Sequence, residues 1–128
     1  MEVDRTTFVP TVLIADDDPD LVALVALRLS RAGYSVLTAA DGAEALEMAE
    51  EFLPDLVVLD VMMPKLTGLD VTRHLRENPR TEHILVMLIS AGFAHEEIWG
   101  LPAGADDYVQ KPFGPQELPN RVQAVLAR

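Results

Sequence analysis

Short apolar runs alternate along the chain with longer runs in which apolar and polar residues mix. The apolar runs at 12–15, 56–59 and 84–89 contain no polar residue. Continuous runs of this kind predict strands buried on both faces, as in a parallel sheet that helices cover. Segments 35–39 and 108–110 are weaker candidates for two further strands.

The mixed runs between these strands predict helices with recognisable ends. Asp18 can cap a helix whose first residue is Pro19, a position where the missing N–H costs no hydrogen bond. Gly33 is placed to end this helix in the left-handed conformation. Asp41 can cap a second helix, with Glu44 as its capping-box partner. The remaining helices are predicted at 68–77, 94–101 and 116–127.

Strands and helices therefore alternate five times along the chain. Because right-handed crossovers place helices on both faces of such a sheet, the pattern predicts a doubly wound α/β domain. We expect one domain at 11–128, preceded by an N-terminal tail at 1–10. In folds of this class, ligands bind at the carboxyl ends of the strands.

The charge and composition of the chain narrow its possible partners. The 21 acidic and 10 basic residues give a formal charge of −11, and the basic residues form no patch. Because nucleic acids are strongly negative, we expect no direct nucleic-acid binding by this chain. The absence of cysteine excludes disulfides and thiolate metal sites. With no signal-peptide pattern and no membrane-spanning run, we expect a cytoplasmic protein without a membrane partner.

Polar residues that could carry chemistry follow four of the predicted strands. Asp16 and Asp17 follow the first strand, Asp60 ends the third, Ser90 ends the fourth and Lys111 follows the fifth. Because parallel strands end at one edge, we expect these groups to meet there. Packed carboxylates repel unless a cation lies among them, and Mg2+ prefers oxygen ligands. A carboxylate in such a site can attack phosphorus while a lysine and a hydroxyl position the transferred group.

Each of these residues has a simpler explanation when it is taken alone. Asp18 is best interpreted as a helix cap. Ser90 or Lys111 by itself would be an ordinary surface residue. Tyr108 could merely pack beside its strand, and Trp99 could either pack or anchor a partner. The arrival of the whole set at one sheet edge is what favours phosphoryl chemistry.

Several segments resemble the signatures of response-regulator receiver domains. They are the acidic segment 12–20, the segment 59–64 followed by 68–70, and the segment 103–108 with 111–113. The resemblance implies a five-stranded parallel sheet in the order 2-1-3-4-5 with five helices. This architecture is the flavodoxin-like, or CheY-like, three-layer sandwich.

The resemblance also implies a phosphoacceptor and a metal site. Asp60 would accept the phosphoryl group. Asp17 and Asp60 would bind Mg2+ directly, and Asp16 would do so largely through water. The backbone carbonyl of Met62 would complete the set of protein ligands.

Other residues receive supporting roles from the same resemblance. The Ser90 hydroxyl, the Ala91 backbone and the Lys111 ammonium would bind the phosphoryl group. Ser90 and Tyr108 would form the switch that moves after phosphorylation. A cis peptide is implied between Lys111 and Pro112, which is an inexpensive conformation for a bond to proline.

The function implied is that of a phosphoacceptor receiver domain in a two-component system, and not of an enzyme acting on other substrates. The phosphoryl donor would be a sensor histidine kinase, a phosphotransfer protein or a small acyl phosphate. The fourth helix and fifth strand would signal to a downstream partner or output domain, from a monomer or weak homodimer. One alternative is a degenerate receiver that serves only as a binding scaffold. Another is a Mg2+-dependent aspartyl-phosphate hydrolase, which usually has a carboxylate where this chain has Met62.

Two regions depart from the usual receiver pattern. The stretch from Ser90 to Gly104 is about one residue short and contains Pro102, so a short fourth helix is expected. Pro119 falls inside the last predicted helix and should bend or delay it by removing a hydrogen bond. Both departures lie on the side expected to form the usual dimer.

Overall fold

The computed structural model describes residues 8–91 and 104–128. The predicted helix at 94–101, together with Trp99 and Pro102, lies outside the described residues. In chain order the elements are β1 (Thr11–Ala15), α1 (Pro19–Arg31), β2 (Ser35–Ala39), α2 (Gly42–Phe52), β3 (Leu56–Asp60), α3 (Gly68–Glu77), β4 (Leu85–Ser90), β5 (Asp107–Gln110) and α5 (Glu117–Leu126).

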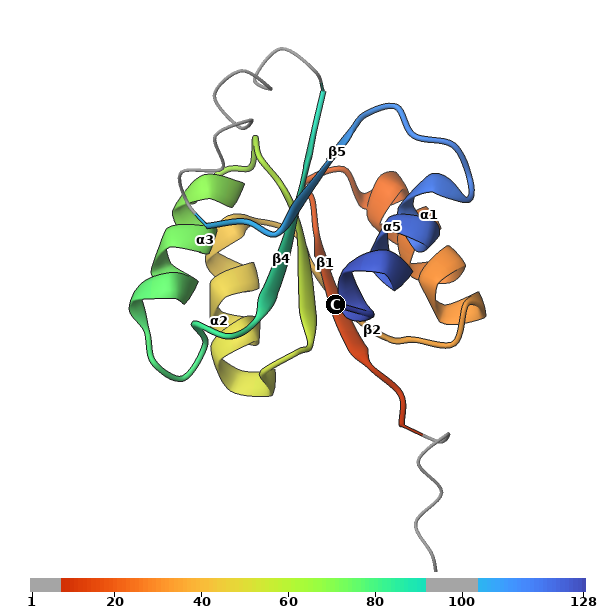
Figure 1. Cartoon of the computed structure of the whole chain (residues 1–128). Helices are drawn as coiled ribbons and strands as arrows, with labels where there is room; N and C mark the ends of the chain where they lie inside the picture. The colour runs from red at the N-terminus through yellow and green to blue at the C-terminus, as the bar shows by residue number, and fades with distance from the viewer. Residues whose placement is uncertain (1–7, 92–103) are drawn as a thin grey trace, which may run out of the picture.

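The five strands form one parallel sheet with helices on both faces. Their order is β2-β1-β3-β4-β5, as predicted. Helices α1 and α5 cover one face, and α2 and α3 cover the other (Figure 1). The doubly wound fold is therefore confirmed, with four of the five predicted helices in the described part of the chain. None of these helices is long and apolar enough to cross a membrane.

The core consists of two apolar clusters separated by the sheet. Leu13 and Leu59 belong to the cluster under α2 and α3, and Ile14 and Val58 belong to the cluster under α1 and α5. All four side chains are fully buried. Because both faces of β1 and β3 are covered, alternate residues of these strands must be equally apolar. Charged groups are therefore left to the positions where the strands end.

The residues predicted to cap the helices lie at the helix ends in the structure. The Asp18 carboxylate accepts hydrogen bonds from the backbone N–H groups of Asp20 and Leu21, at 3.0 and 3.3 Å. Gly33 has a φ of +102° and follows the end of α1 in the left-handed conformation. Asp41 caps α2 through the N–H of the third residue of that helix. These caps satisfy backbone groups that a helix cannot pair internally.

Pro119 does not act as the sequence predicted. Helix α5 begins at Glu117, so Pro119 is its third residue and is buried. The first intrahelical hydrogen bond runs from the N–H of Asn120 to the carbonyl of Gln116, at 3.0 Å. N–H groups in the first turn of a helix have no intrahelical acceptor, so proline removes nothing at this position. The prediction that Pro119 would remove one of the helix's hydrogen bonds is therefore wrong.

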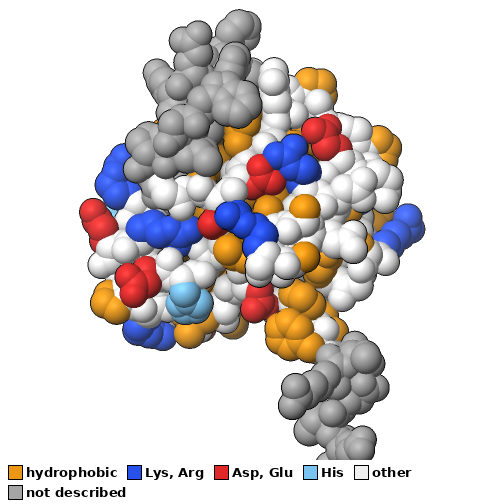
Figure 2. All heavy atoms as spheres, in the orientation of Figure 1, with side chains coloured by type: hydrophobic (Ala, Val, Ile, Leu, Met, Phe, Trp, Pro, Cys, Tyr) orange, Lys and Arg blue, Asp and Glu red, His pale blue; other side chains and the backbone are white. Residues whose placement is uncertain are grey.

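Ion pairs hold the short edge strand β5 from two sides. Acidic and basic side chains lie next to one another on this face of the molecule (Figure 2). Arg76 of α3 pairs with Asp106 just before β5, at 3.0 Å, and Arg128 lies 3.8 Å from the same residue. From α5, Arg121 pairs with Asp107, the first residue of β5.

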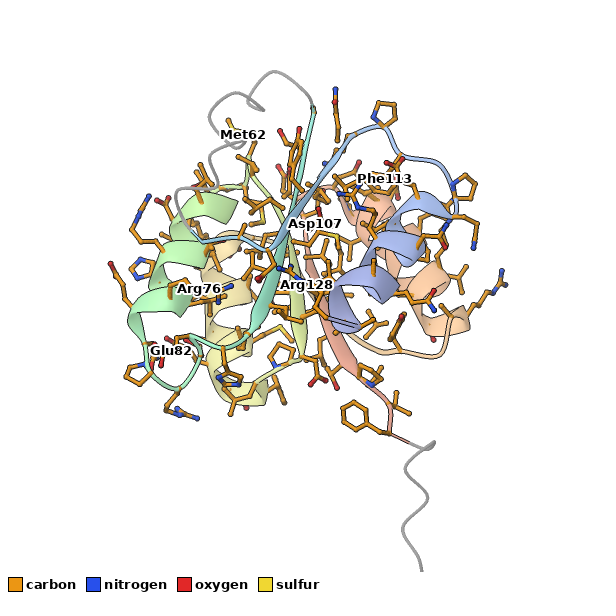
Figure 3. The ribbon with its side chains drawn as sticks, in the orientation of Figure 1. Met62, Arg76, Glu82, Asp107, Phe113 and Arg128 are labelled. Atoms are coloured by element: carbon orange, nitrogen blue, oxygen red, sulfur yellow. The ribbon has the colours of Figure 1, made fainter. Side chains whose placement is uncertain are left out.

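Arg76 makes the most extensive of these contacts, in the lower part of α3 in Figure 3. Its guanidinium donates to the backbone carbonyls of Gly104, Glu82 and Ile84, at 3.0, 2.9 and 2.6 Å. It also donates to the Asp106 carboxylate, which accepts a backbone N–H of β4 at 2.9 Å. This one side chain therefore ties α3 to the start of β4 and to the entry of β5.

We expect Arg76→Ala to lower the free energy of unfolding by about 2–4 kcal/mol, because it leaves partly buried acceptors and the Asp106 carboxylate unpaired. Urea unfolding followed by circular dichroism measures this change. Arg73 of the same helix is the matched control, since Asp70 is the one partner that its exposed side chain bonds in the described part of the chain. Arg73→Ala should change the stability by no more than about 0.5 kcal/mol. Equal losses in the two variants would contradict the role given to Arg76.

Candidate functional site

Three carboxylates meet where β1 and β3 end. Asp16 directly follows β1, Asp60 is the last residue of β3, and the two strands are paired neighbours. Oxygen atoms of Asp16, Asp17 and Asp60 all lie within 4.8 Å of one another. Asp16 is 1% exposed and Asp60 is 5% exposed, whereas Asp17 is open to solvent. The predicted acidic cluster is thus present, and its oxygen atoms are spaced as ligands of one ion could be.

The environment of Asp60 opposes its ionisation. Burial raises the pKa of Asp60 to about 6, and the charges of Asp16 and Asp17 act in the same direction. Lys111 and a hydrogen bond from the Met62 backbone oppose this rise without cancelling it. A further cation close to Asp60 would therefore stabilise the ionised form of its carboxyl group.

Lys111 is the cation that the fold supplies. Its ammonium lies 2.8 Å from Asp16 Oδ2 and 3.6 Å from Asp60 Oδ1. Burial alone would lower the pKa of Lys111, but its hydrogen bond and attraction to Asp16 raise it. The other oxygen of Asp16 accepts the backbone N–H of Asp18 at 3.0 Å, so both Asp16 oxygens have protein partners. The peptide bond between Lys111 and Pro112 is cis, as the resemblance implied.

Ser90 and Tyr108 lie on the last two strands of the sheet, β4 and β5. Ser90 ends β4 and is buried, and its carbonyl accepts the backbone N–H of Lys111 at 2.6 Å. Ala91 follows it and is exposed. Tyr108 pairs with Leu88 of β4, and its side chain packs against the core under α2 and α3. The structure therefore brings Ser90 to the same edge as Asp60, while the Tyr108 side chain packs into the core on the α2/α3 face.

The loop after Asp60 carries Met62, whose side chain is 68% exposed. The loop is closed at its base, where the N–H of Gly68 donates to the carbonyl of Val61 at 3.0 Å. A Cβ atom at position 68 would lie only 2.6 Å from the carbonyl oxygen of Asp60. From the sequence, Gly68 was expected only as the first residue of a helix. The feature of the sequence that could have indicated a role is a glycine at the start of the helix that follows a strand ending in Asp60.

Comparison with known proteins agrees with this geometry. The family model described as the response regulator receiver domain matches residues 12–123. The chain belongs to this family. It is 47% identical over 117 residues to the alkaline phosphatase synthesis transcriptional regulatory protein PhoP of Bacillus subtilis, covering 91% of the chain and 48% of that protein. The receiver domain thus spans about half the length of the curated relatives that it matches.

Solved receiver structures have the same fold. A putative response regulator from Chloroflexus aurantiacus is 40% identical, with a TM-score of 0.87 over 94% of this chain and 100% of that one. The receiver domain of sensor histidine kinase PA1611 from Pseudomonas aeruginosa is 28% identical, with a TM-score of 0.85 over 94% and 100%. That structure has a magnesium ion coordinated in its active site cleft.

The raised pKa of Asp60 predicts that Asp60→Asn stabilises the metal-free receiver domain above pH 6. Ionisation of Asp60 costs the wild type stability as the pH rises from 3.8, the ordinary value, to about 6. Below pH 3.8 the Asp60 carboxyl of the wild type is neutral in both the folded and the unfolded state, so the stability gain of Asp60→Asn vanishes there. Above this window we expect a gain of about 3 kcal/mol. Urea unfolding across pH 3–8 measures it, and a gain that does not change with pH would contradict the burial argument.

Proposed function

We propose that this receiver domain accepts a phosphoryl group on Asp60 in the presence of Mg2+. The donor is a sensor histidine kinase, a phosphotransfer protein or a small acyl phosphate. The observation that carries the proposal is the meeting of Asp16, Asp17, Asp60 and Lys111 at one edge of the sheet. Family membership supports it, because this set stands at the positions of the receiver signatures.

The donor set fits Mg2+, which is a hard cation that prefers oxygen ligands and keeps several waters. Asp17 and Asp60 would bind it directly, together with the backbone carbonyl of Met62. Asp16 would act largely through water, which agrees with the two protein partners its oxygens already have. When bound, Mg2+ would offset the carboxylate charge and attract phosphate oxygens.

In the transfer step, a carboxylate oxygen of Asp60 attacks phosphorus as the bond from phosphorus to the donor nitrogen or oxygen breaks. The electron pair of that bond leaves with the donor. With a pKa of about 6, Asp60 is mostly ionised at neutral pH and is ready to attack. Lys111 neutralises charge on the transferred group, and the Ser90 hydroxyl and the Ala91 N–H donate to its oxygens.

Phosphorylation would change the contacts at the ends of β4 and β5. The aspartyl phosphate adds nearly two negative charges and three acceptor oxygens. Lys111 would then exchange Asp16 for the phosphoryl group, and Ser90 would gain an acceptor. Because the Ser90 carbonyl holds the Lys111 N–H at 2.6 Å, both strand ends respond together. Tyr108 lies on β5 two residues before its last residue, and it would carry the change to the fourth helix and fifth strand.

We further infer that the chain signals rather than turns over other substrates. The position at which an aspartyl-phosphate hydrolase usually has its acid–base carboxylate is held by Met62, whose thioether carries no acidic proton. The match over residues 12–123 supports a domain at 11–128 with a tail at 1–10. We propose that it works in the cytoplasm as a monomer or weak homodimer, and that an output domain or separate protein receives its signal.

The direct test is incubation with Mg2+ and acetyl phosphate, followed by intact mass measurement. The wild type should gain one phosphoryl group, and neither Asp60→Asn nor a sample with chelator should gain it. A folded wild type that gains nothing from acetyl phosphate or from a phosphorylated histidine donor would refute the proposal. The domain would then be a binding scaffold.

Lys111→Met should separate metal binding from phosphoryl transfer. Loss of the ammonium leaves the carboxylates uncompensated, so Mg2+ should bind about three- to tenfold more tightly. Phosphorylation of Asp60 should nevertheless slow by about 10²-fold or more, because the transferred group loses a cation. Calorimetric titration with MgCl2 and timed mass spectra measure the two effects. Weaker Mg2+ binding in a folded variant would show that Lys111 does not compete with the metal.

A further inference from the structure

The loop between β3 and α3 touches the start of α2 more closely than an ordinary side chain would permit. Gly42 is the first residue of α2, and a Cβ atom built on it would lie 1.9 Å from the carbonyl oxygen of Leu66. The two atoms would overlap, so only glycine allows this approach. The N–H of Gly42 also donates to the Pro64 carbonyl at 3.4 Å. Helix α2 can therefore approach this loop so closely only with glycine at position 42.

The tip of the same loop is a strained turn centred on Lys65. The N–H of Leu66 donates to the carbonyl of Pro64 at 2.8 Å, and Lys65 has a φ of 72°. This combination is a γ-turn, which is rare for a residue with a side chain and persists only where the surroundings enforce it. The Lys65 ammonium lies 3.4 Å from an oxygen of Asp41, the N-cap of α2. That ion pair is exposed and weak, so the backbone contact is the stronger constraint.

The base of the loop is held in a similar way from the opposite side. Gly68 is the first residue of α3, and a Cβ atom there would lie 2.6 Å from the carbonyl oxygen of Asp60. The first residues of two helices, Gly68 and Gly42, therefore contact the loop backbone closely at its base and at its tip. Met62 lies between these two contacts.

We propose that the start of α2 is a positioning element for the metal-binding loop. By docking on Leu66 through Gly42, it holds the Met62 carbonyl in a fixed position relative to Asp60. This inference rests on the proposed Mg2+ site. Mg2+ requires near-octahedral geometry, so a displaced carbonyl ligand weakens its binding even when every carboxylate is intact. The strain at Lys65 is retained because it keeps the loop tip seated on α2.

The test compares two glycine-to-alanine variants of the whole chain by calorimetric titration with MgCl2, well below their melting temperatures. Gly42→Ala must displace either the loop or α2, so its Kd for Mg2+ should rise by about tenfold or more. Gly114→Ala is the matched control, because Gly114 has no positive φ and, apart from its chain neighbours, no atom of residues 8–91 and 104–128 lies within 4 Å of its Cβ position. Its Kd should equal that of the wild type.

Lys65→Gly is a second variant that decides the question if Gly42→Ala does not fold. Glycine relieves the strained φ, so the melting temperature should not fall, yet the loop tip becomes free. We expect its Kd for Mg2+ to rise by about three- to tenfold. A purely structural role for the contact would lower melting temperatures and leave the Kd unchanged.

Wild-type Mg2+ affinity in the variants that fold would overturn the positioning role and leave the proposed function untouched. No Mg2+ binding by the wild type would instead overturn the proposed metal site, and the positioning role with it. The wild-type titration therefore distinguishes the two failures.

Discussion

The repulsion between Asp16 and Asp60, two buried carboxylates at the end of an apolar sheet, is the constraint on which the chemistry of this domain depends. Helices cover both faces of the sheet, so charge is admitted only where strands end, and neighbouring strands end side by side. Burial and this repulsion raise the pKa of Asp60 to about 6. Lys111 supplies a single positive charge against three carboxylates. The site is therefore left with a deficit of positive charge that a metal ion can offset.

The position of Lys111 depends in turn on contacts far from the site. Lys111 directly follows β5, a strand of four residues at the edge of the sheet. Arg76 fixes the entry to this strand from α3, and Arg121 fixes its first residue from α5. Edge strands are otherwise the most easily displaced part of a sheet. These arginines thus contribute to the geometry around Asp60 without touching it.

Close backbone contacts provide a second kind of positioning. The loop after Asp60 is bounded by Gly42 and Gly68, where a side chain would collide with a carbonyl group. Such contacts add little energy, but they leave the loop few alternative paths. A ligand provided by a backbone carbonyl needs this restriction, because it has no side-chain rotamers with which to adapt.

The sequence by itself determined the elements and most of their ends, because the interactions that set them are local. Continuous apolar runs marked the buried strands, and Asp18 and Gly33 marked the limits of α1 through bonds to residues nearby. The acidic cluster was also predictable, since the carboxyl ends of parallel strands share one edge. Pro119 shows the limit of such reasoning. Its effect depends on where the helix begins, and as the third residue of α5 it removes no intrahelical hydrogen bond.

Only the tertiary structure decided which residues hold the site in place. The Arg76 guanidinium donates to the carbonyl of Gly104, 28 positions away in the chain. Gly42, at the start of α2, lies against Leu66 in the loop between β3 and α3. No local pattern marks either pair, because an arginine or a glycine is compatible with many partners until packing selects one. The burial that raises the pKa of Asp60 is likewise a property of the assembled core. The sequence thus determined which groups meet at the sheet edge, and packing between distant segments decided how closely they are held.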